Sequence, residues 1–454
     1  MRKKVTPNRI FLSKDELPKS WYNIQADFKD PIKNYVAPDG SEIGANEMSV
    51  IFAPELAAQE FTQERFVDIP KEVFDILARF RPSPLVRAYG LEKALDTPAR
   101  IYYKYEGENP SGSHKLNTAI PQAFYNKIAG MYGMTTETGA GQWGIASAIA
   151  ASIYDMELKV YMVKVSAEQK PYRRIMMNTY GAEVISSPSM TTEAGRKMLE
   201  KDPDARGTLG GAITEAVEVA LQDPGLNYVL GSVLNHVILH QSIIGQETMK
   251  QMEYMDDYPD YVIGCNGGGS NFGGIAFPFV GKQLREGGNT IFIAAEPAAC
   301  PKLTQGKFAY DYADEGEMTP ILPMYTLGHD FNPAGIHAGG LRYHGDSPLL
   351  SKLYHDGIVQ AEAHTQNKVF DAALTFAKAE YILPAPESAH AIASAIDRAL
   401  QCKEEGRDAT ILVNISGHGH LDMVAYEAYL KGELDDYAYR AESIVTPDVG
   451  KTLA

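Results

Sequence analysis

Apolar runs alternate with helical segments along most of the chain from Arg100 onward. In the first half, three runs rich in Val, Ile and Tyr are typical of strands: RIYYKYE (100–106), KVYMVKV (159–165) and AEVISS (182–187). The stretches between and around them predict helices over residues 115–129, 145–154 and 169–181, the last closed by Gly181. In the second half, three apolar runs each end in a loop: YVIG (261–264), TIFIAAEP (290–297) and ATILVNISG (409–417).

Strands that alternate with helices predict an α/β fold, in which open, mostly parallel sheets are covered by helices on both faces. Loops that carry function are then expected at the carboxyl ends of the strands. Pro121 lies inside the predicted 115–129 helix and indicates either a kink or a late start. Residues 1 to about 80 mix proline, charge and aromatic side chains, which predicts irregular segments with short helices.

The composition narrows the class of protein. The 454 residues are 44% apolar and 22% charged, which is enough to bury a core in two or three domains. The formal charge of −16 argues against nucleic acid or an anionic membrane as a partner, because both attract basic surfaces. Three widely spaced cysteines predict neither a disulfide framework nor a thiolate metal site. Because no apolar stretch reaches about 18 residues, we expect a cytoplasmic globular protein.

The strongest local motif is CNGGGSNFGG (265–274), directly after the predicted strand YVIG. Its consecutive glycines let backbone N–H groups close around an anion, and the following helix adds the positive end of its dipole. Ser270 and Asn271 can donate from their side chains, so the loop suits a buried phosphate monoester. A flexible turn is one alternative. A dinucleotide fold is another, because a relaxed glycine pattern and an acid on the next strand are present: Gly267, Gly269, Gly273 and Glu296.

The turn ENPSGSHK (108–115) delivers Lys115 to the start of the predicted helix. A cation is disfavoured there, because a helix N-terminus carries partial positive charge. The pKa of Lys115 should therefore be lowered and its neutral amine more available, as a Schiff base requires. Pyridoxal phosphate needs a loop that binds its phosphate and a lysine whose neutral amine can bond its aldehyde, and the sequence offers both. On local sequence alone, Lys115 could equally be a surface lysine.

The segment TETGAGQ (136–142) places small residues ahead of a predicted helix. Exposed N–H groups at that position suit a substrate carboxylate. Glu137, at the edge of the segment, can serve as acid and base if enclosure raises its pKa. An ordinary capped loop with a solvated glutamate is the alternative.

Three further positions near the C-terminus have chemical potential. Ser416 follows a predicted strand, where its hydroxyl can meet a ligand, although a plain turn serine fits equally well. His418 and His420 resemble a metal-binding pair, but the sequence offers them no evident third ligand and a solvated loop is the simpler interpretation. Glu387 lies in the first turn of a predicted helix, where an acid is favoured by the helix dipole.

Taken together, these motifs resemble the β chain of tryptophan synthase, a fold type II pyridoxal-phosphate enzyme. The resemblance runs from about Arg81 to Asp422. Five motifs occur in the same order: SGSHKLN, ETGAGQWG, GCNGGGSNFGG, LPAPESAHA and NISGHGHLD. The N-terminal part with LPKSWYNIQADF is similar to a second, longer class of these chains.

The resemblance implies two open, mostly parallel sheets flanked by helices, in domains of residues 1–231 and 232–454. A mobile subdomain that closes on the substrate is expected over about 130–215, and residues 81–113 are candidates to pack with the second domain. A homodimer is expected. A tryptophan synthase α chain is a doubtful partner, because the long N-terminus could cover its contact surface. A monovalent cation is an open second cofactor, and no other metal is expected.

The resemblance also implies roles for residues in the matching motifs. Lys115 would hold the cofactor in a Schiff base and move the substrate's α-proton, with His114 beside the cofactor. Ser416 would hydrogen-bond the pyridine nitrogen, and Glu137 would assist the departing group and then steer indole onto an aminoacrylate. The other cofactor-binding residues would be Gln142, Gly267, Gly268, Gly269, Ser270, Asn271 and Glu387. The substrate-binding residues would be Thr138, Gly139, Ala140, Gly141, Gln142 and Arg342.

Two positions depart from the better-known class of this family. Trp143 stands where that class usually has histidine, and Arg342 where it has an aspartate that meets the serine hydroxyl. Because arginine suits an anionic leaving group, O-phospho-L-serine rivals L-serine as the donor in the leading hypothesis, synthesis of L-tryptophan from indole. The other hypotheses are a serine deaminase, cysteine synthase or threonine synthase, a nucleotide-binding oxidoreductase, and a binding protein without catalysis.

Overall fold

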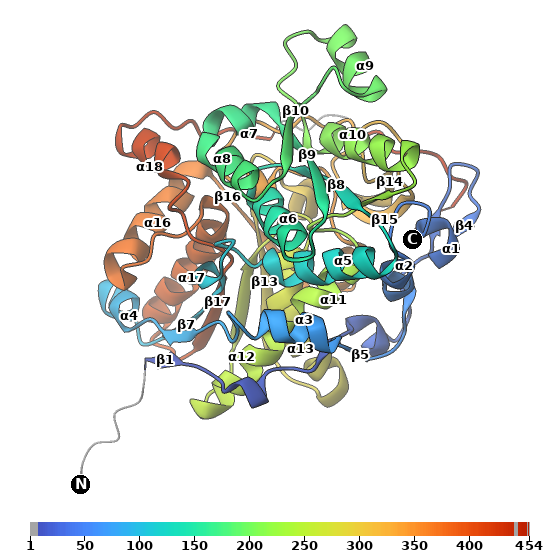
Figure 1. The fold of residues 1–454 in the computed structure, drawn as a ribbon. Helices are drawn as coiled ribbons and strands as arrows, with labels where there is room; N and C mark the ends of the chain where they lie inside the picture. The colour runs from blue at the N-terminus through green and yellow to red at the C-terminus, as the bar shows by residue number, and fades with distance from the viewer. Residues whose placement is uncertain (1–7, 440–443, 452, 454) are drawn as a thin grey trace.

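A computed structural model describes residues 8–439, 444–451 and 453 (Figure 1). Within these residues, the largest sheet has seven strands. In sheet order they are β1 (Arg9–Ile10), β6 (Leu85–Arg87), β7 (Arg100–Tyr105), β17 (Thr410–Ile415), β12 (Tyr261–Cys265), β13 (Ile291–Pro297) and β16 (Val359–His364). The strands from β7 to β16 are parallel, and β1 and β6 extend one edge in antiparallel fashion.

A second sheet has four parallel strands: β10 (Glu183–Ser187), β9 (Glu157–Val163), β8 (Gly133–Thr138) and β11 (Leu226–Tyr228). These two sheets agree with the predicted α/β class. A third, antiparallel sheet was not predicted: β14 (Lys307–Tyr312), β15 (Ile321–Thr326), β3 (Tyr35–Val36) and β4 (Glu42–Ile43). A fourth sheet pairs β2 (Ser20–Tyr22) with β5 (Phe66–Asp68). The proposed division into domains stays a prediction.

Helices surround the sheets (Figure 1). Those before β11 are α1 (Ala45–Met48), α2 (Pro54–Phe61), α3 (Lys71–Leu77), α4 (Tyr89–Leu95), α5 (Leu116–Ile128), α6 (Gln142–Ile153), α7 (Lys164–Gln169), α8 (Pro171–Thr179), α9 (Glu193–Lys201) and α10 (Leu209–Gln222). Those after it are α11 (Asn235–Gln241), α12 (Ile243–Tyr254), α13 (Ser270–Glu286), α14 (Lys302–Gln305), α15 (Pro348–His355), α16 (Gln366–Glu380), α17 (Pro386–Glu405) and α18 (Met423–Leu430). Short 3₁₀ helices are η1 (Lys14–Glu16), η2 (Ile24–Asp27), η3 (Glu106–Glu108) and η4 (Gly339–Leu341).

Both faces of the seven-stranded sheet are buried under helices. Val262 on β12 belongs to a core cluster that includes Phe272 of α13, whereas its neighbour Ile263 belongs to a separate cluster with Ile392 of α17. Because successive side chains of a strand point to opposite faces, α13 and α17 cover opposite sides of the sheet. Such a double cover explains why the runs YVIG and ATILV read as continuously apolar. Across the described residues, no helix is both long enough and apolar enough to cross a membrane.

The helix that carries the candidate lysine begins where the sequence predicts. Residues 116–128 form α5, and Lys115 is the residue immediately before it. The helix continues through Pro121, so of the two alternatives for that residue a late start is wrong. In the N-terminal part the predicted short helices are confirmed, but the strands β1 to β5 were missed. Strands of two or three residues are too short to show an alternating pattern.

A buried carboxylate ties the N-terminal part to the rest of the chain. Glu60 on α2 accepts hydrogen bonds from the Tyr35 hydroxyl at 2.6 Å and from His236 Nδ1 at 2.7 Å. It also accepts from the backbone N–H groups of Asn235 and His236 at 2.8 and 2.9 Å, which are the first residues of α11. Glu60 therefore supplies a negative charge at the start of α11 and fixes the chain just before it.

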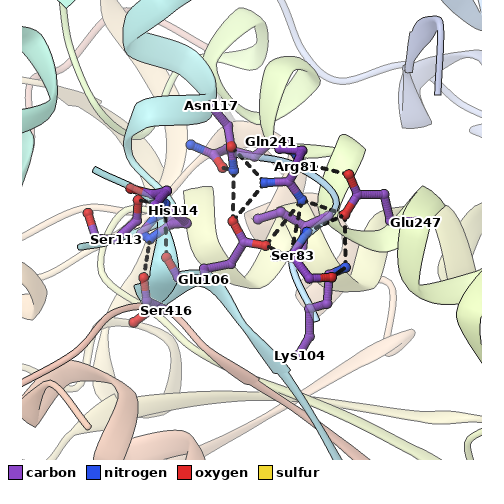
Figure 2. A network of polar contacts seen from close by, with 12 residues as sticks. Arg81, Ser83, Lys104, Glu106, Ser113, His114, Asn117, Gln241, Glu247 and Ser416 are labelled. Atoms are coloured by element: carbon purple, nitrogen blue, oxygen red, sulfur yellow. Dashed lines mark hydrogen bonds and ion pairs between the residues drawn. The ribbon is translucent and has the colours of Figure 1, made fainter. Parts of the chain in front are cut away.

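A second buried network lies beside the start of α5 (Figure 2). Arg81 donates through Nε to Glu247 at 2.7 Å and through Nη1 to Glu106 at 2.9 Å. Lys104 on β7 also donates to Glu247, at 2.8 Å, and Asn117 on α5 donates to Glu106 at 3.1 Å. The charged side chains are at most 1% exposed. The network thus joins β7, η3, α5 and α12 through fully desolvated charges.

Replacing Arg81 by methionine tests how much the fold depends on this network. The change leaves Glu106 without its cationic partner and Glu247 with Lys104 alone, so we expect a loss of about 3–5 kcal/mol in the free energy of unfolding. Urea unfolding followed by circular dichroism measures it. The control is Arg79→Met, at an exposed position two residues away, where we expect a change within about 0.5 kcal/mol. Equal losses in the two variants would contradict this account.

Candidate active site

A cavity lies beside the carboxyl ends of β8 and β11, with about 930 Å³ free of protein atoms, part of it open to solvent. Lys115 and Glu137 are the charged residues among the described residues that line it. Most of the remaining wall is apolar and includes Ile51, Phe52, Leu209, Ile213 and Leu230. The first two come from the N-terminal part, so that segment forms part of the cavity wall. The cavity lies where loops that carry function are expected, at the carboxyl ends of strands.

Lys115 is half-buried and lines the cavity. Its Nζ donates to the Gly231 carbonyl at 2.6 Å and lies 3.4 Å from Ser270 Oγ. Burial lowers the pKa of Lys115 to about 8, against a weaker opposing attraction from Glu137. The lowered pKa agrees with the prediction, but its main cause is loss of hydration rather than the helix start. The side chain is therefore not a surface lysine.

His114 and Ser416 meet beside Lys115. The backbone N–H of His114 donates to the Ser416 carbonyl at 2.8 Å, and its Nε2 lies 3.3 Å from Ser270 Oγ. Burial lowers the pKa of His114 to about 3, so the ring is neutral. The Ser416 hydroxyl lies 2.7 Å from the hydroxyl of Ser388, at the start of α17. Figure 2 shows His114 and Ser416 next to the Arg81 network.

The glycine loop follows β12 and leads directly into α13. A Cβ on Gly268 would lie 2.7 Å from Ser232 Oγ, and one on Gly267 would lie 2.5 Å from the Gly340 carbonyl. Gly269 has φ of +99°, a conformation that favours glycine. Ser232 Oγ is buried and has no hydrogen-bond partner within the described chain. A close backbone cradle with an unused hydroxyl at the start of a long helix fits a phosphate group.

Two side chains near this loop have structural partners. Asn271 donates to the Cys265 carbonyl at 3.1 Å and accepts from Asn414 at 2.7 Å, so its amide braces the ends of β12 and β17. Glu296 accepts from the backbone N–H groups of Leu303 and Thr304 at 3.0 and 2.9 Å. Because that carboxylate caps α14, it is not available to a ribose, which removes the acid on which the dinucleotide alternative depends.

Glu137 enters the cavity from β8. Its Oε2 accepts a hydrogen bond from the Tyr228 hydroxyl at 2.5 Å. Burial raises the pKa of Glu137 to about 7. Enclosure of this glutamate therefore has the predicted effect on its acidity. The nearby Trp143 indole N–H donates to Thr136 Oγ1 at 2.7 Å, which places its ring in the cavity wall.

The loop over residues 138–142 turns from β8 into α6. Thr138 Oγ1 accepts from the N–H groups of Gly141 and Gly144 at 3.2 and 3.1 Å, and Gly139, Ala140 and Gln142 line the cavity. The Ala140 carbonyl accepts from Arg173 Nη1 at 2.7 Å. Arg173 and Lys170 both pair with Asp422, each at 2.7 Å, and all three side chains are at most 3% exposed. Buried ion pairs therefore hold this loop against the segment after β17.

Two predicted residues, Glu387 and Arg342, are not among the residues that line the cavity. Glu387, at the start of α17, accepts from the Gly340 N–H at 2.9 Å, and its second carboxylate oxygen has no hydrogen-bond partner among the described residues. Arg342 does not line the cavity around Lys115. It donates to Ser166 Oγ at 2.5 Å and lines a neighbouring hollow with Arg206. Burial lowers the pKa of Arg342 to about 10.

Other residues of the site escaped the sequence analysis. Tyr228 is the last residue of β11, Ser232 lies shortly after it in the chain, and Ser388 lies in the first turn of α17. The run NYVLGS (227–232) ends in Gly-Ser after an apolar stretch, which is the one local signal that could have indicated a strand leading into the site. His418 and His420 stack on each other with ring centroids 4.5 Å apart. The cluster of potential metal ligands found in the described residues, Glu362, His364 and Asp397, includes neither.

Comparison with known proteins agrees with this geometry. Residues 76–417 match the family described as "Pyridoxal-phosphate dependent enzyme". The chain is 53% identical over 428 residues to "Tryptophan synthase beta chain 2" of Methanosarcina mazei, covering 94% of this chain and 97% of the relative. The protein of the same name from Thermotoga maritima is 54% identical over 418 residues, covering 92% and 99%.

Solved structures show the same fold at low sequence identity. A fungal L-serine ammonia-lyase from Rhizomucor miehei matches with a TM-score of 0.56 and 19% identity, over 78% of this chain and 98% of its own. A threonine deaminase from T.th. matches with a TM-score of 0.55 and 19% identity, over 77% and 96%. These likenesses concern the fold alone. Together with the much closer relatives, they show that the chain is a fold type II pyridoxal-phosphate dependent enzyme and belongs to the tryptophan synthase beta chain family.

Proposed function

We propose that this enzyme makes L-tryptophan from indole and a serine-type donor in the cavity of Lys115. The observation that carries the proposal is the pairing of an amine of lowered pKa with an acid of raised pKa in one largely apolar cavity. The amine suits the amino-acid half of the reaction and the apolar wall suits an aromatic acceptor. The names of the curated relatives support the same reaction.

The residues of the site fit pyridoxal phosphate. The loop 267–270, the backbone N–H of Asn271 and the unpaired Ser232 hydroxyl would hold its phosphate, and Lys115 Nζ would bond its aldehyde. Ser416 would face the pyridine nitrogen, with His114 and Glu387 beside the ring. When bound, the cofactor supplies an electron sink for the carbanion at the substrate's α-carbon.

Lys115 and Ser416 would set the type of reaction. With a pKa of about 8, Lys115 has an appreciable neutral fraction near neutral pH, so it can accept and return the α-proton. The Ser416 hydroxyl would be a neutral partner for the pyridine nitrogen and would not force a full positive charge on the ring. That favours departure of the β-substituent over transamination.

Glu137 and the wall of the cavity would govern the two substrates. In its protonated form Glu137 can give a proton to the departing hydroxyl, and in its charged form it can accept the indole N–H. A pKa of about 7 keeps both forms populated near neutral pH. Phe52, Leu209 and Ile213 would pack against the acceptor, while the loop 138–142 would hold the donor's carboxylate.

The proposal also covers the compartment, the partners and a second cofactor of the enzyme. Cys265, Cys300 and Cys402 are buried and free, which favours a reducing compartment such as the cytoplasm. We expect a homodimer. An α chain is a weaker expectation, because the long N-terminal part could cover its contact surface. Glu60 and Ser20 of that part hydrogen-bond to α11 and α12, respectively. A monovalent cation stays an open second cofactor.

The first test is uptake of the cofactor. The purified protein should bind pyridoxal phosphate and absorb at about 410 nm, and Lys115→Ala should lose that band because the bonded amine is gone. Lys164→Ala, at a half-buried lysine outside the cavity lining, is the matched control and should keep the band. A wild-type protein that stays colourless after incubation with the cofactor would rule out every pyridoxal hypothesis.

The second test identifies the acceptor. With L-serine and indole, the enzyme should form L-tryptophan, detected by chromatography and mass spectrometry. With L-serine alone, pyruvate should form at most slowly. Rapid pyruvate formation that indole does not divert would favour a serine deaminase instead.

An O-phospho-L-serine donor remains a specific candidate because of Arg342. The guanidinium is buried, and no described carboxylate lies within ion-pair distance of it. It packs against Gly339, which lines the cavity: a Cβ on that glycine would lie 3.3 Å from Nη2. A buried guanidinium behind the cavity wall, whose main attractive charge is Glu387 and which has no hydrogen-bonded carboxylate among the described residues, attracts an anionic leaving group.

The third test compares the donors directly. In the wild type, O-phospho-L-serine should be used, and Arg342→Ala should lower kcat/KM for it about tenfold more than for L-serine, because only the phosphorylated donor gains from the charge. Steady-state kinetics with both donors measures this ratio. A strong preference for L-serine that Arg342→Ala leaves unchanged would contradict the phosphoserine hypothesis.

The fourth test concerns the carboxylate loop. Arg173→Met removes the donor to the Ala140 carbonyl and half of the pairing of Asp422, so KM for the amino-acid donor should rise about tenfold with a smaller change in kcat. Arg174→Met, at the exposed neighbouring position, should leave KM unchanged. An equal effect in the two variants would show that Arg173 does not support the loop.

A further inference from the structure

The hydrogen bonding of Glu137 is one-sided. Every hydrogen bond that another side chain donates to its carboxyl group goes to Oε2: from the Tyr228 hydroxyl at 2.5 Å and, at a marginal 3.5 Å, from Thr136 Oγ1. Thr136 is already engaged, because its hydroxyl donates to the Val229 carbonyl and accepts from Trp143. Tyr228 is therefore the effective side-chain partner of Oε2, and no described side chain donates to Oε1.

Tyr228 is a well-fixed donor. It ends β11, is 2% exposed and lines the same cavity as Glu137. Its ring packs against Phe52, with ring centroids 5.7 Å apart. Burial raises the pKa of Tyr228 well above its usual range, so the phenol keeps its proton at every pH at which an enzyme works. A fixed O–H that cannot ionise favours the charged form of the carboxyl group that it touches.

The other titratable neighbours of Glu137 act differently. Lys115, at the start of α5, attracts the carboxylate through space and is not hydrogen-bonded to it. Tyr343, just after η4, lines the cavity but donates its hydroxyl to the Ala313 carbonyl at 2.8 Å. Burial of Glu137 opposes both Lys115 and Tyr228, because it favours the protonated form.

We propose that Tyr228 is a positioning residue of this enzyme, whose hydroxyl holds Oε2 of Glu137, turns Oε1 to the reacting molecules and sets the pH range over which the carboxyl group changes charge. The proposal rests on the function proposed above for Glu137. It deepens that function, because a buried acid without this donor would stay protonated to higher pH. The carboxyl group would then offer the indole N–H a charged acceptor only at that higher pH.

The test is the pH profile of the holoenzyme carrying Tyr228→Phe, which removes one hydroxyl and keeps the ring. Attack by indole uses the charged form of Glu137, so kcat/KM for indole rises with pH through the ionisation of that group. Loss of a hydrogen bond to a carboxylate should move this rising limb up by about one pH unit. At pH 7 the variant should be slower by up to about tenfold, and at pH 9 it should approach the wild type.

Two comparisons make the result specific. Tyr343→Phe removes a different hydroxyl from the cavity wall, and its rising limb should keep the wild-type position. In a Glu137→Gln background the limb should be lost, and adding Tyr228→Phe should move nothing further. The midpoint of urea unfolding of each holoenzyme checks that the variants are folded.

The outcomes separate this proposal from the one on which it rests. If the wild type forms no tryptophan at any pH, the proposed function fails. If the wild type forms tryptophan but Tyr228→Phe keeps the wild-type limb, or loses rate equally at every pH, the Tyr228 proposal alone is overturned. A limb moved upward in Tyr228→Phe and not in Tyr343→Phe supports it.

Discussion

The position of the reactive amine depends on charges that lie outside the site. Arg81 shares its guanidinium between Glu106 and Glu247 where no water reaches them, and Lys104 completes the set. Desolvated charges tolerate little displacement, because a partner that moves away leaves an unpaired ion in an apolar interior. Glu106 also accepts from Asn117, two residues beyond Lys115. The first turn of α5, and with it the amine, is therefore placed by the geometry of this network.

Buried carboxylates fix other segments around the cavity in the same way. Glu60 fixes the start of α11, behind the wall formed by Gly231 and Ser232, and Asp422 holds Arg173 against the Ala140 carbonyl. Parallel strands bring several loops to one edge of the sheets, but they do not fix how those loops lie relative to each other. Buried carboxylates such as Glu60 and Asp422 supply that restraint.

Particular residues show how much of this site the sequence predicted and why the rest was not predicted. The glycine loop, Lys115 and Glu137 are visible because each depends on local features: a strand end, a helix start, a run of small residues. Tyr228 and Ser232 were missed because their roles depend on contacts that form only in the folded chain, where β11 pairs with β8 and Ser232 lies against the glycine loop. Asn271 shows the converse, since a donor expected at a phosphate braces two strands instead. The antiparallel sheet was missed because two of its strands have only two residues.

One physical cause acts in opposite directions on the two charged groups of the cavity. Burial disfavours charge, so it lowers the pKa of Lys115 and raises that of Glu137, to about 8 and about 7. The mutual attraction of the two groups opposes both shifts and keeps them from becoming extreme. His114 is neutral and Ser416 carries no charge, so neither adds a charge beside Lys115. A base and an acid with neighbouring pKa values in one cavity can exchange roles within one reaction cycle.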